Sequence, residues 1–125
     1  MPAPMPPPRR FLLDGRTHEY IEPERDGPVE DVRSWLMGEY PRVHARVPLA
    51  AGGTVYVYAS ATHWDRNQIH VQWYDDNKAS LTAWLAKADI RPVTDSEWDI
   101  DQYNRTPDWL KSTRWGYRFP GFLPE

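Results

Sequence analysis

The most constraining feature of this sequence is a set of three short segments in which aliphatic residues alternate with polar or aromatic ones. The segments run from Thr54 to Ala59, from Gln68 to Tyr74 and from Leu81 to Leu85. Successive side chains of a strand point to opposite faces, so this alternation predicts β-strands with one buried face and one outward face. The residues between the segments, 64–67 and 75–78, are of types that turns favour. We therefore expect an antiparallel meander.

Two further strands and a short helical turn are predicted on either side of this meander. Val43, Ala45 and Val47 alternate with polar residues ahead of a small-residue loop at 49–53. After the third segment, residues 86–89 are long enough for a single helical turn before a last short strand at 90–93. Residues 43–93 therefore predict four strands, one helical turn and a final strand.

This order resembles the SH3-like small β-barrel, in its Tudor and KOW-like branches. The residues that carry the resemblance are Val71–Asn77, then Ala83–Ala86, then Asp89–Val93. They look like that family's closing unit of a strand, an acidic turn, a tryptophan strand, one helical turn and a hydrophobic-Arg-Pro sequence. The resemblance covers about residues 43–93 and implies a five-stranded barrel. It implies no single function, because such folds carry many unrelated ligands.

The segments around the barrel predict a hairpin and several helices. Asp14-Gly15 suits a tight turn between Phe11–Leu13 and Thr17–Ile21. Asp26 and Pro28 fit the start of a helix that would end at Gly38. Its apolar face would consist of Val29, Val32, Trp35 and Leu36.

The last third predicts two more short helices. Thr94 to Glu97 has the pattern of a capping box that would begin a helix running to about Asn104. Thr106-Pro107 repeats a cap-then-proline signal for a helix through Lys111, and an aromatic tail follows. The predicted fold class is thus mainly β with flanking helices (α+β). Its parts are a Pro-rich flexible leader (1–10), a hairpin and helix (11–42), the barrel (43–93) and the C-terminal helices and tail (94–125).

The composition narrows the classes of function that are open to this chain. The chain has 125 residues and no cysteine, which excludes disulfides, thiolate zinc sites and cysteine nucleophiles. Its formal net charge is −3, whereas proteins that grip nucleic acid through phosphates are usually basic. No apolar stretch approaches the roughly 20 residues of a membrane span. Prolines stand where a signal peptide would need an apolar helix, so we expect a cytoplasmic protein.

The predicted site is an aromatic surface on the outward face of the strands. Such a surface needs a cover or a partner, because large apolar patches are rarely left in water. Either the flanking segments cover it or part of it binds a partner, and the sparse basic residues nearby favour a protein partner. The residues expected to contact that partner are Tyr56, Tyr58, Trp64, His70, Tyr74 and Trp84. In the Tudor-like resemblance, Trp64 and Tyr74 with a third ring would instead form a cage for a methylated side chain.

The alternative function is nucleic-acid binding by the basic, aromatic C-terminal segment. Aromatic rings for base stacking with cations for phosphates would come from Arg105, Lys111, Arg114, Trp115 and Arg118. No phosphate loop, serine elbow or helical His-x-x-x-His pattern is present, so we expect no catalytic residue, no metal and no cofactor. Two histidines from adjacent strands that meet a carboxylate remain the open alternative. Small size, missing catalytic motifs and the aromatic load also fit an accessory or regulatory protein of a phage or mobile element.

Overall fold

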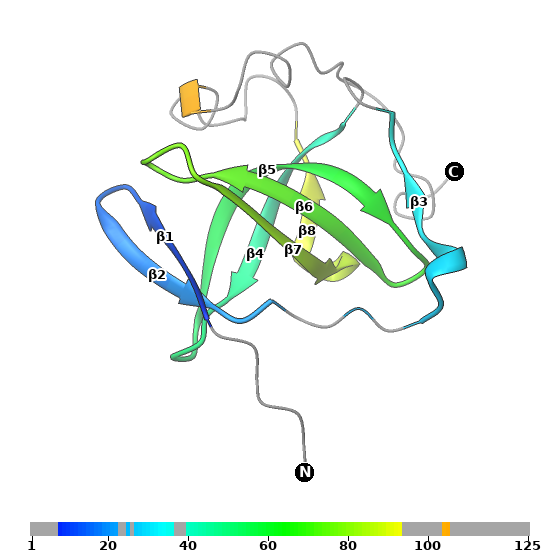
Figure 1. The fold of residues 1–125 in the computed structure, drawn as a ribbon, viewed down its shortest axis with the longest axis horizontal. Coiled ribbons are helices and arrows are strands. Elements are labelled where there is room, and N and C mark those ends of the chain that lie inside the picture. The colour runs from blue at the N-terminus through cyan, green and yellow to red at the C-terminus, as the bar shows by residue number, and fades with distance from the viewer. Residues whose placement is uncertain (1–7, 23–24, 26, 37–39, 94–103, 106–125) are drawn as a thin grey trace.

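The computed structural model describes residues 8–22, 25, 27–36, 40–93 and 104–105. Its strands form antiparallel pairs throughout, as Figure 1 shows, and the prediction of a mainly β fold is confirmed. The elements are β1 (Arg9–Leu13), β2 (Arg16–Tyr20), η1 (Val29–Asp31), β3 (Arg33–Ser34), β4 (Arg42–Pro48), β5 (Thr54–Trp64), β6 (Gln68–Tyr74), β7 (Ser80–Ala86), η2 (Lys87–Asp89) and β8 (Ile90–Pro92). η1 and η2 are single 3₁₀ turns. In the part of the chain that is described, no helix has the length and apolar character needed to cross a membrane.

The larger sheet has the strand order β7-β6-β5-β4-β8, and β3 pairs with the far end of β5. β4 to β7 form a meander in which each strand pairs with the next. After the turn η2, β8 returns to the first strand, with Val43 opposite Pro92 and Ala45 opposite Ile90. The four strands, the helical turn and the final strand predicted for residues 43–93 are therefore all present in that order.

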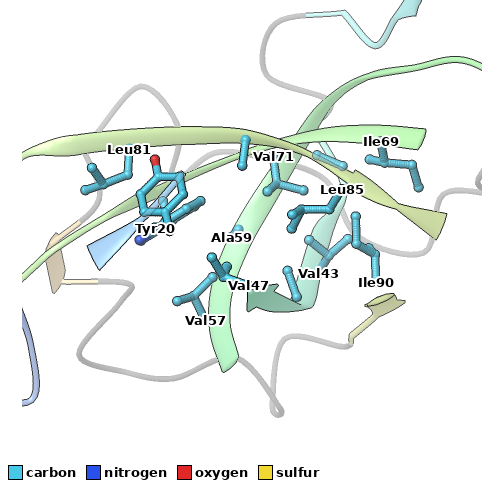
Figure 2. Packing of buried hydrophobic residues seen from close by; sticks show 14 of the residues in the cluster. Tyr20, Val43, Val47, Val57, Ala59, Ile69, Val71, Leu81, Leu85 and Ile90 are labelled. Atoms are coloured by element: carbon cyan, nitrogen blue, oxygen red, sulfur yellow. The ribbon is translucent and has the colours of Figure 1, made fainter. Parts of the chain in front are cut away.

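The core lies on the face of this sheet that the alternation predicted to be buried. Figure 2 shows the aliphatic side chains of β4 to β8 gathered on one side with Tyr20 of β2. Val57, Val71 and Ala83 illustrate this alternation. Each is at most 1% exposed, while the residues before and after it on the strand are more exposed. Cross-strand pairs of such residues stabilise a sheet, because burial and packing act on the same face.

β5 is longer than predicted and contains an irregularity. It continues to Trp64, and its register against β6 shifts between Ala61 and His63. An extra residue in one strand changes which face the following side chains occupy. Trp64 consequently lies opposite the buried Ile69 and packs against the core.

The predicted helix over residues 26–38 is wrong. η1 is one turn long and lacks a side-chain cap, and the chain then extends as β3 along β5. The backbone N–H of Trp35 donates to the Thr62 carbonyl at 3.1 Å, and the Trp35 ring packs on Trp64 at 4.4 Å. Pairing with the extended β5 satisfies the backbone and buries Trp35, so it outweighs the local helical pattern. The predicted apolar face does not form, because Val29 and Leu36 are 79% and 70% exposed.

The N-terminal hairpin forms as predicted. Asp14 and Gly15 have φ angles of 52° and 81°, the left-handed pair that a tight hairpin turn requires. β1 begins at Arg9, inside the segment predicted to be a flexible leader, and Arg9 pairs with Tyr20. The predicted C-terminal helices lie outside the described residues except for Asn104 and Arg105, which are helical.

The turn after β6 fastens this hairpin to the larger sheet. The carboxylate of Asp75, which is 4% exposed, accepts the N–H of Leu12 at 3.1 Å. Asp76 accepts the N–H groups of Asp14 at 3.2 Å and Gly15 at 2.9 Å, and its own N–H donates to the Leu12 carbonyl at 2.8 Å. We call Asp75 and Asp76 the aspartate turn. It provides hydrogen-bond partners for backbone groups of the hairpin where the hairpin meets the larger sheet, although the two segments are more than 60 residues apart in the sequence.

Replacing Asp75 should destabilise the fold. Its other carboxylate oxygen accepts the N–H groups of Asn77 and Ala79, both at 2.9 Å, so Asp75→Ala leaves three donors without their acceptor. We expect a loss of roughly 2–4 kcal/mol in the free energy of unfolding, measured by denaturant titration. Asn77→Ala, in the same turn but exposed, is the matched control and should cost less than about 0.5 kcal/mol. Equal losses in the two variants would contradict the role given to the aspartate turn.

Candidate functional site

The structure does not bring the six predicted contact residues together on one surface. It separates them into an exposed group, a covered group, one buried tyrosine and one tryptophan on the core face. The separation follows from the irregularity in β5 and from the two segments that pack on the sheet. Each group has different chemistry.

The first group lies on β4 and β5 and consists of the exposed Tyr56 with the half-buried His44 and Tyr58, which we call the open aromatic patch. Tyr56 is 55% exposed and stacks nearly parallel on the His44 ring, with centroids 4.9 Å apart and planes at 6°. Tyr58 lies opposite His44 in the register and contacts the same ring at 4.6 Å. The sequence prediction named the two tyrosines and missed His44. The alternation of β4, with Val43 and Ala45 inward, was the signal that could have found it.

Two arginines flank this patch. Arg46 lies opposite Tyr56, and its Nε and Nη2 donate to the Asp89 carboxylate at 3.0 and 2.6 Å. Arg91 lies opposite His44 on β8 and is exposed. The ion pair holds one guanidinium beside the tyrosine, so the patch combines rings and cations in fixed positions.

The covered group is His70 with Trp84. Their rings are 5.2 Å apart across β6 and β7, and the Arg25 guanidinium lies 5.5 Å from the Trp84 ring centroid. The same guanidinium is paired with Asp65 at 2.7 Å, and its side chain is only 11% exposed. The linker before η1 therefore covers this part of the predicted surface. Although burial raises the pKa of Asp65, hydrogen bonds from Arg25, Asn67 and Gln68 hold it below its ordinary value.

A polar cluster adjoins the covered group. The Thr62 hydroxyl lies 2.7 Å from Nδ1 of His70 and 2.9 Å from Nδ1 of His63. The hydroxyl oxygen can accept from either ring, and its single proton can go to a ring nitrogen or to the His70 carbonyl, 3.3 Å away. Burial, with smaller contributions from the charges of His63 and Arg9, lowers the pKa of His70 to about 4. Burial also lowers the pKa of His63.

His63 and His70 do meet across β5 and β6, but the group between them is the Thr62 hydroxyl and not the carboxylate of the alternative that the sequence left open. The two histidine rings are 5.6 Å apart, and the Thr62 hydroxyl between them belongs to a side chain that is 4% exposed. Among the described residues, no three His, Cys, Asp or Glu side chains are grouped so that they could hold a metal ion. The cluster is therefore interpreted as a structural contact, in which the Thr62 hydroxyl and the two imidazole rings satisfy each other's hydrogen-bonding groups.

Trp64 and Tyr74 do not form the cage that the Tudor-like resemblance implied. Trp64 lies opposite Ile69, five residues before Tyr74, which corresponds to about 16 Å along β6. Tyr74 is 7% exposed, and the Nε of Arg105 donates to its carbonyl at 3.2 Å. Arg105 also pairs with Asp76 at 3.1 Å with 11% of its side chain exposed. Its contacts are therefore structural, and the other predicted nucleic-acid residues, 111, 114, 115 and 118, lie outside the described residues.

A pocket lies at the opposite end of β5 from the open aromatic patch. It has a volume of about 330 Å³. Its walls come from η1 and β3, from the turn between β5 and β6, and from η2. The lining residues are Asp31, Arg33, Trp64, Asp65, Arg66 and Lys87. Of these, only Trp64 was among the residues predicted from the sequence.

Comparison with known proteins adds no relative. A scan against protein-family models and searches of curated proteins and of solved structures found no match to this chain.

The histidine cluster makes stability depend on pH. The folded-state pKa of His70, about 4, lies below the ordinary 6.5, so the unfolded chain takes up a proton first as pH falls. The contribution of neutral His70 to the free energy of unfolding is fully present above about pH 6.5. It is lost progressively as the pH falls towards 4. The amide oxygen of His70→Asn can still accept from Thr62 but does not titrate. Between pH 7 and pH 4 this variant should therefore lose about 2–3 kcal/mol less of its free energy of unfolding than wild type does. Denaturant unfolding at pH 4 to 7 measures it, and parallel profiles for the variant and wild type would contradict the assignment.

Proposed function

We propose that this protein is a non-catalytic, cytoplasmic interaction module that binds a protein partner through the open aromatic patch. The observation that carries the proposal is the exposure of Tyr56, which is 55% exposed although it is held in a stack with His44. A tyrosine that only filled space on the sheet would have a cover, as Trp84 has in Arg25. Arg25 covers Trp84, whereas more than half of the Tyr56 side chain is exposed.

The patch has the properties of an energetic centre of a protein interface. Tyrosine and arginine are enriched among residues that dominate binding energy, and Tyr56, Arg46 and Arg91 supply both types. The His44 stack and the Arg46–Asp89 pair fix these side chains before binding. Fixed side chains lose less conformational entropy when a partner docks, so more of the contact energy appears as affinity.

The charge pattern favours a protein partner with an acidic rim. Beside the rings, Arg46 and Arg91 outnumber the Asp89 carboxylate that pairs with Arg46, and this surplus of positive charge would attract carboxylates, whereas the net charge of −3 opposes long polyanions. The proposed scaffold for this surface is an SH3-like barrel, supported by the strand order and by the return of β8 onto β4. An accessory or regulatory role in a phage or mobile element stays part of the proposal and rests on size and composition.

The proposal predicts that one exposed side chain controls capture of the partner. Wild type used as bait in lysate of the native host should retain a defined protein after nuclease treatment, and Tyr56→Ala should reduce its capture at least tenfold. Val29→Ala, which trims a side chain that is 79% exposed and lies off the patch, is the matched control and should capture normally. Both variants should keep wild-type stability to within about 1 kcal/mol, because the altered side chains are largely exposed.

Two results would contradict this proposal. Equal capture by Tyr56→Ala and wild type would place the binding surface elsewhere on the molecule. Capture that disappears with nuclease would favour the nucleic-acid alternative, in which the C-terminal cations at 111, 114 and 118 make the contact.

A further inference from the structure

The pocket at the end of β5 is independent of the open aromatic patch. Trp64 in its wall and Tyr56 in the patch are eight residues apart on the same strand, which corresponds to about 26 Å. The volume of about 330 Å³ is at the small end of the range for ligand sites. The pocket can therefore be occupied without obstructing the proposed partner surface.

The pocket has a surplus of positive charge. Arg33, Arg66 and Lys87 line it, against the carboxylates of Asp31 and Asp65. Asp65 is already neutralised by the buried Arg25 and accepts the N–H groups of Asn67 and Gln68 at 2.8 and 2.7 Å. Its charge acts on Arg25 and on Lys87, so Arg33 and Arg66 face the exposed carboxylate of Asp31.

Two of the cations are positioned by the structure itself. Nη1 of Arg33 donates to the Glu30 carbonyl at 2.7 Å, and this hydrogen bond holds the guanidinium against η1. Lys87 begins η2, and its backbone N–H donates to the Asn67 carbonyl at 3.2 Å, so its stem is anchored at the β5–β6 turn. Burial lowers the pKa of the Lys87 ammonium, opposed by the charge of Asp65. An ammonium drawn partly out of water gains more from a bound anion than an exposed one.

The remaining wall is aromatic. The Trp64 indole packs on Trp35 at 4.4 Å, which holds the ring in place, and it lines the pocket as well. A fixed indole beside cations suits a ligand that joins a flat ring to an anionic group, because bases stack on aromatic rings and guanidiniums bind phosphate through paired hydrogen bonds.

We propose that this pocket binds a nucleoside phosphate, with its base on Trp64 and its phosphate on Arg33, Arg66 and Lys87. The ligand's phosphate adds a negative charge where the lining cations outnumber the carboxylates, and the base covers the indole. Because the pocket is small, the simplest occupant is a monophosphate, either as a free nucleotide or as the phosphorylated end of a single strand.

Isothermal titration calorimetry of the full chain at low salt tests this proposal with AMP, adenosine and inorganic phosphate as separate probes. AMP should bind with one-to-one stoichiometry and more tightly than either of the other two. Arg33→Ala and Arg66→Ala should each weaken AMP binding about tenfold. Arg16→Ala removes the same charge from an exposed position in the hairpin turn region and should leave AMP binding unchanged.

Two further variants separate loss of the site from loss of the fold. Asp31→Asn removes the opposing carboxylate and should tighten AMP binding about twofold to fivefold, a gain that misfolding cannot produce. Trp64→Phe keeps an aromatic ring on the core and should weaken AMP while leaving inorganic phosphate unchanged. Tyr56→Ala should not affect AMP binding, so failure of the partner proposal and failure of this one are distinguishable.

The proposal is overturned if AMP shows no saturable binding, if inorganic phosphate binds as tightly as AMP, or if the arginine variants bind like wild type. A 5′-phosphorylated pentanucleotide distinguishes the two sources of ligand. If the pentanucleotide binds more tightly than AMP, the ligand is the phosphorylated end of a strand. If it binds more weakly, the ligand is a free nucleotide.

Discussion

The aspartate turn is the interaction on which the rest of the structure depends. Its two carboxylates accept backbone N–H groups of the N-terminal hairpin and so hold that hairpin against the end of the larger sheet. The Gly15 N–H lowers the pKa of the Asp76 carboxyl, with help from Asp14 and Arg105 and against the effect of burial. Held in this position, Phe11 and Tyr20 pack on the buried Trp73 at ring distances of 5.5 and 5.4 Å. Without the hairpin, the largest fully buried side chain of the core would face water at that end.

The docking of the flanking segments also decides where function can reside. The hairpin closes one end of the sheet, and the linker places Arg25 over Trp84. The hairpin covers the sheet with the buried rings of Phe11 and Tyr20, and Arg25 is held in place by its ion pair with Asp65, so both covers are part of the fold. What they leave open is the His44, Tyr56 and Tyr58 surface on one side and the Trp64 pocket at the other end of β5. The two proposed sites thus lie on parts of the sheet that the hairpin and Arg25 do not cover.

The strands of the larger sheet were predictable because their signal is local. Alternation places Val71 and Trp73 on one face and His70 and Gln72 on the other whatever the rest of the chain does. The hairpin turn was equally local, since Asp14-Gly15 suits positive φ angles. The segment at 26–38 failed because its helical pattern was outweighed by pairing with β5 and by the burial of Trp35. Neither of these influences can be read within a window of a dozen residues.

The candidate sites were predictable only in part. Tyr56 and Tyr58 followed from alternation, but the bulge that returns Trp64 to the core face depends on the register between β5 and β6. The cover over Trp84 comes from Arg25, and Asp65, its ion-pair partner, is 40 residues further along the chain. The pocket combines three segments that only the fold brings together. Long-range pairing of charged side chains leaves no periodic trace, so these features had no signal in a single sequence.

Hydroxyl-radical footprinting of the free protein, read at each aromatic residue by mass spectrometry, tests the central claim most directly. That claim is that the docked hairpin closes one end of the sheet and that Tyr56, among the described residues, is an exposed ring. The account predicts rapid modification of Tyr56 and strong protection of Tyr20, Trp73 and Tyr74. If Tyr20 and Trp73 reacted as fast as Tyr56, the hairpin would not be docked and the account would be contradicted.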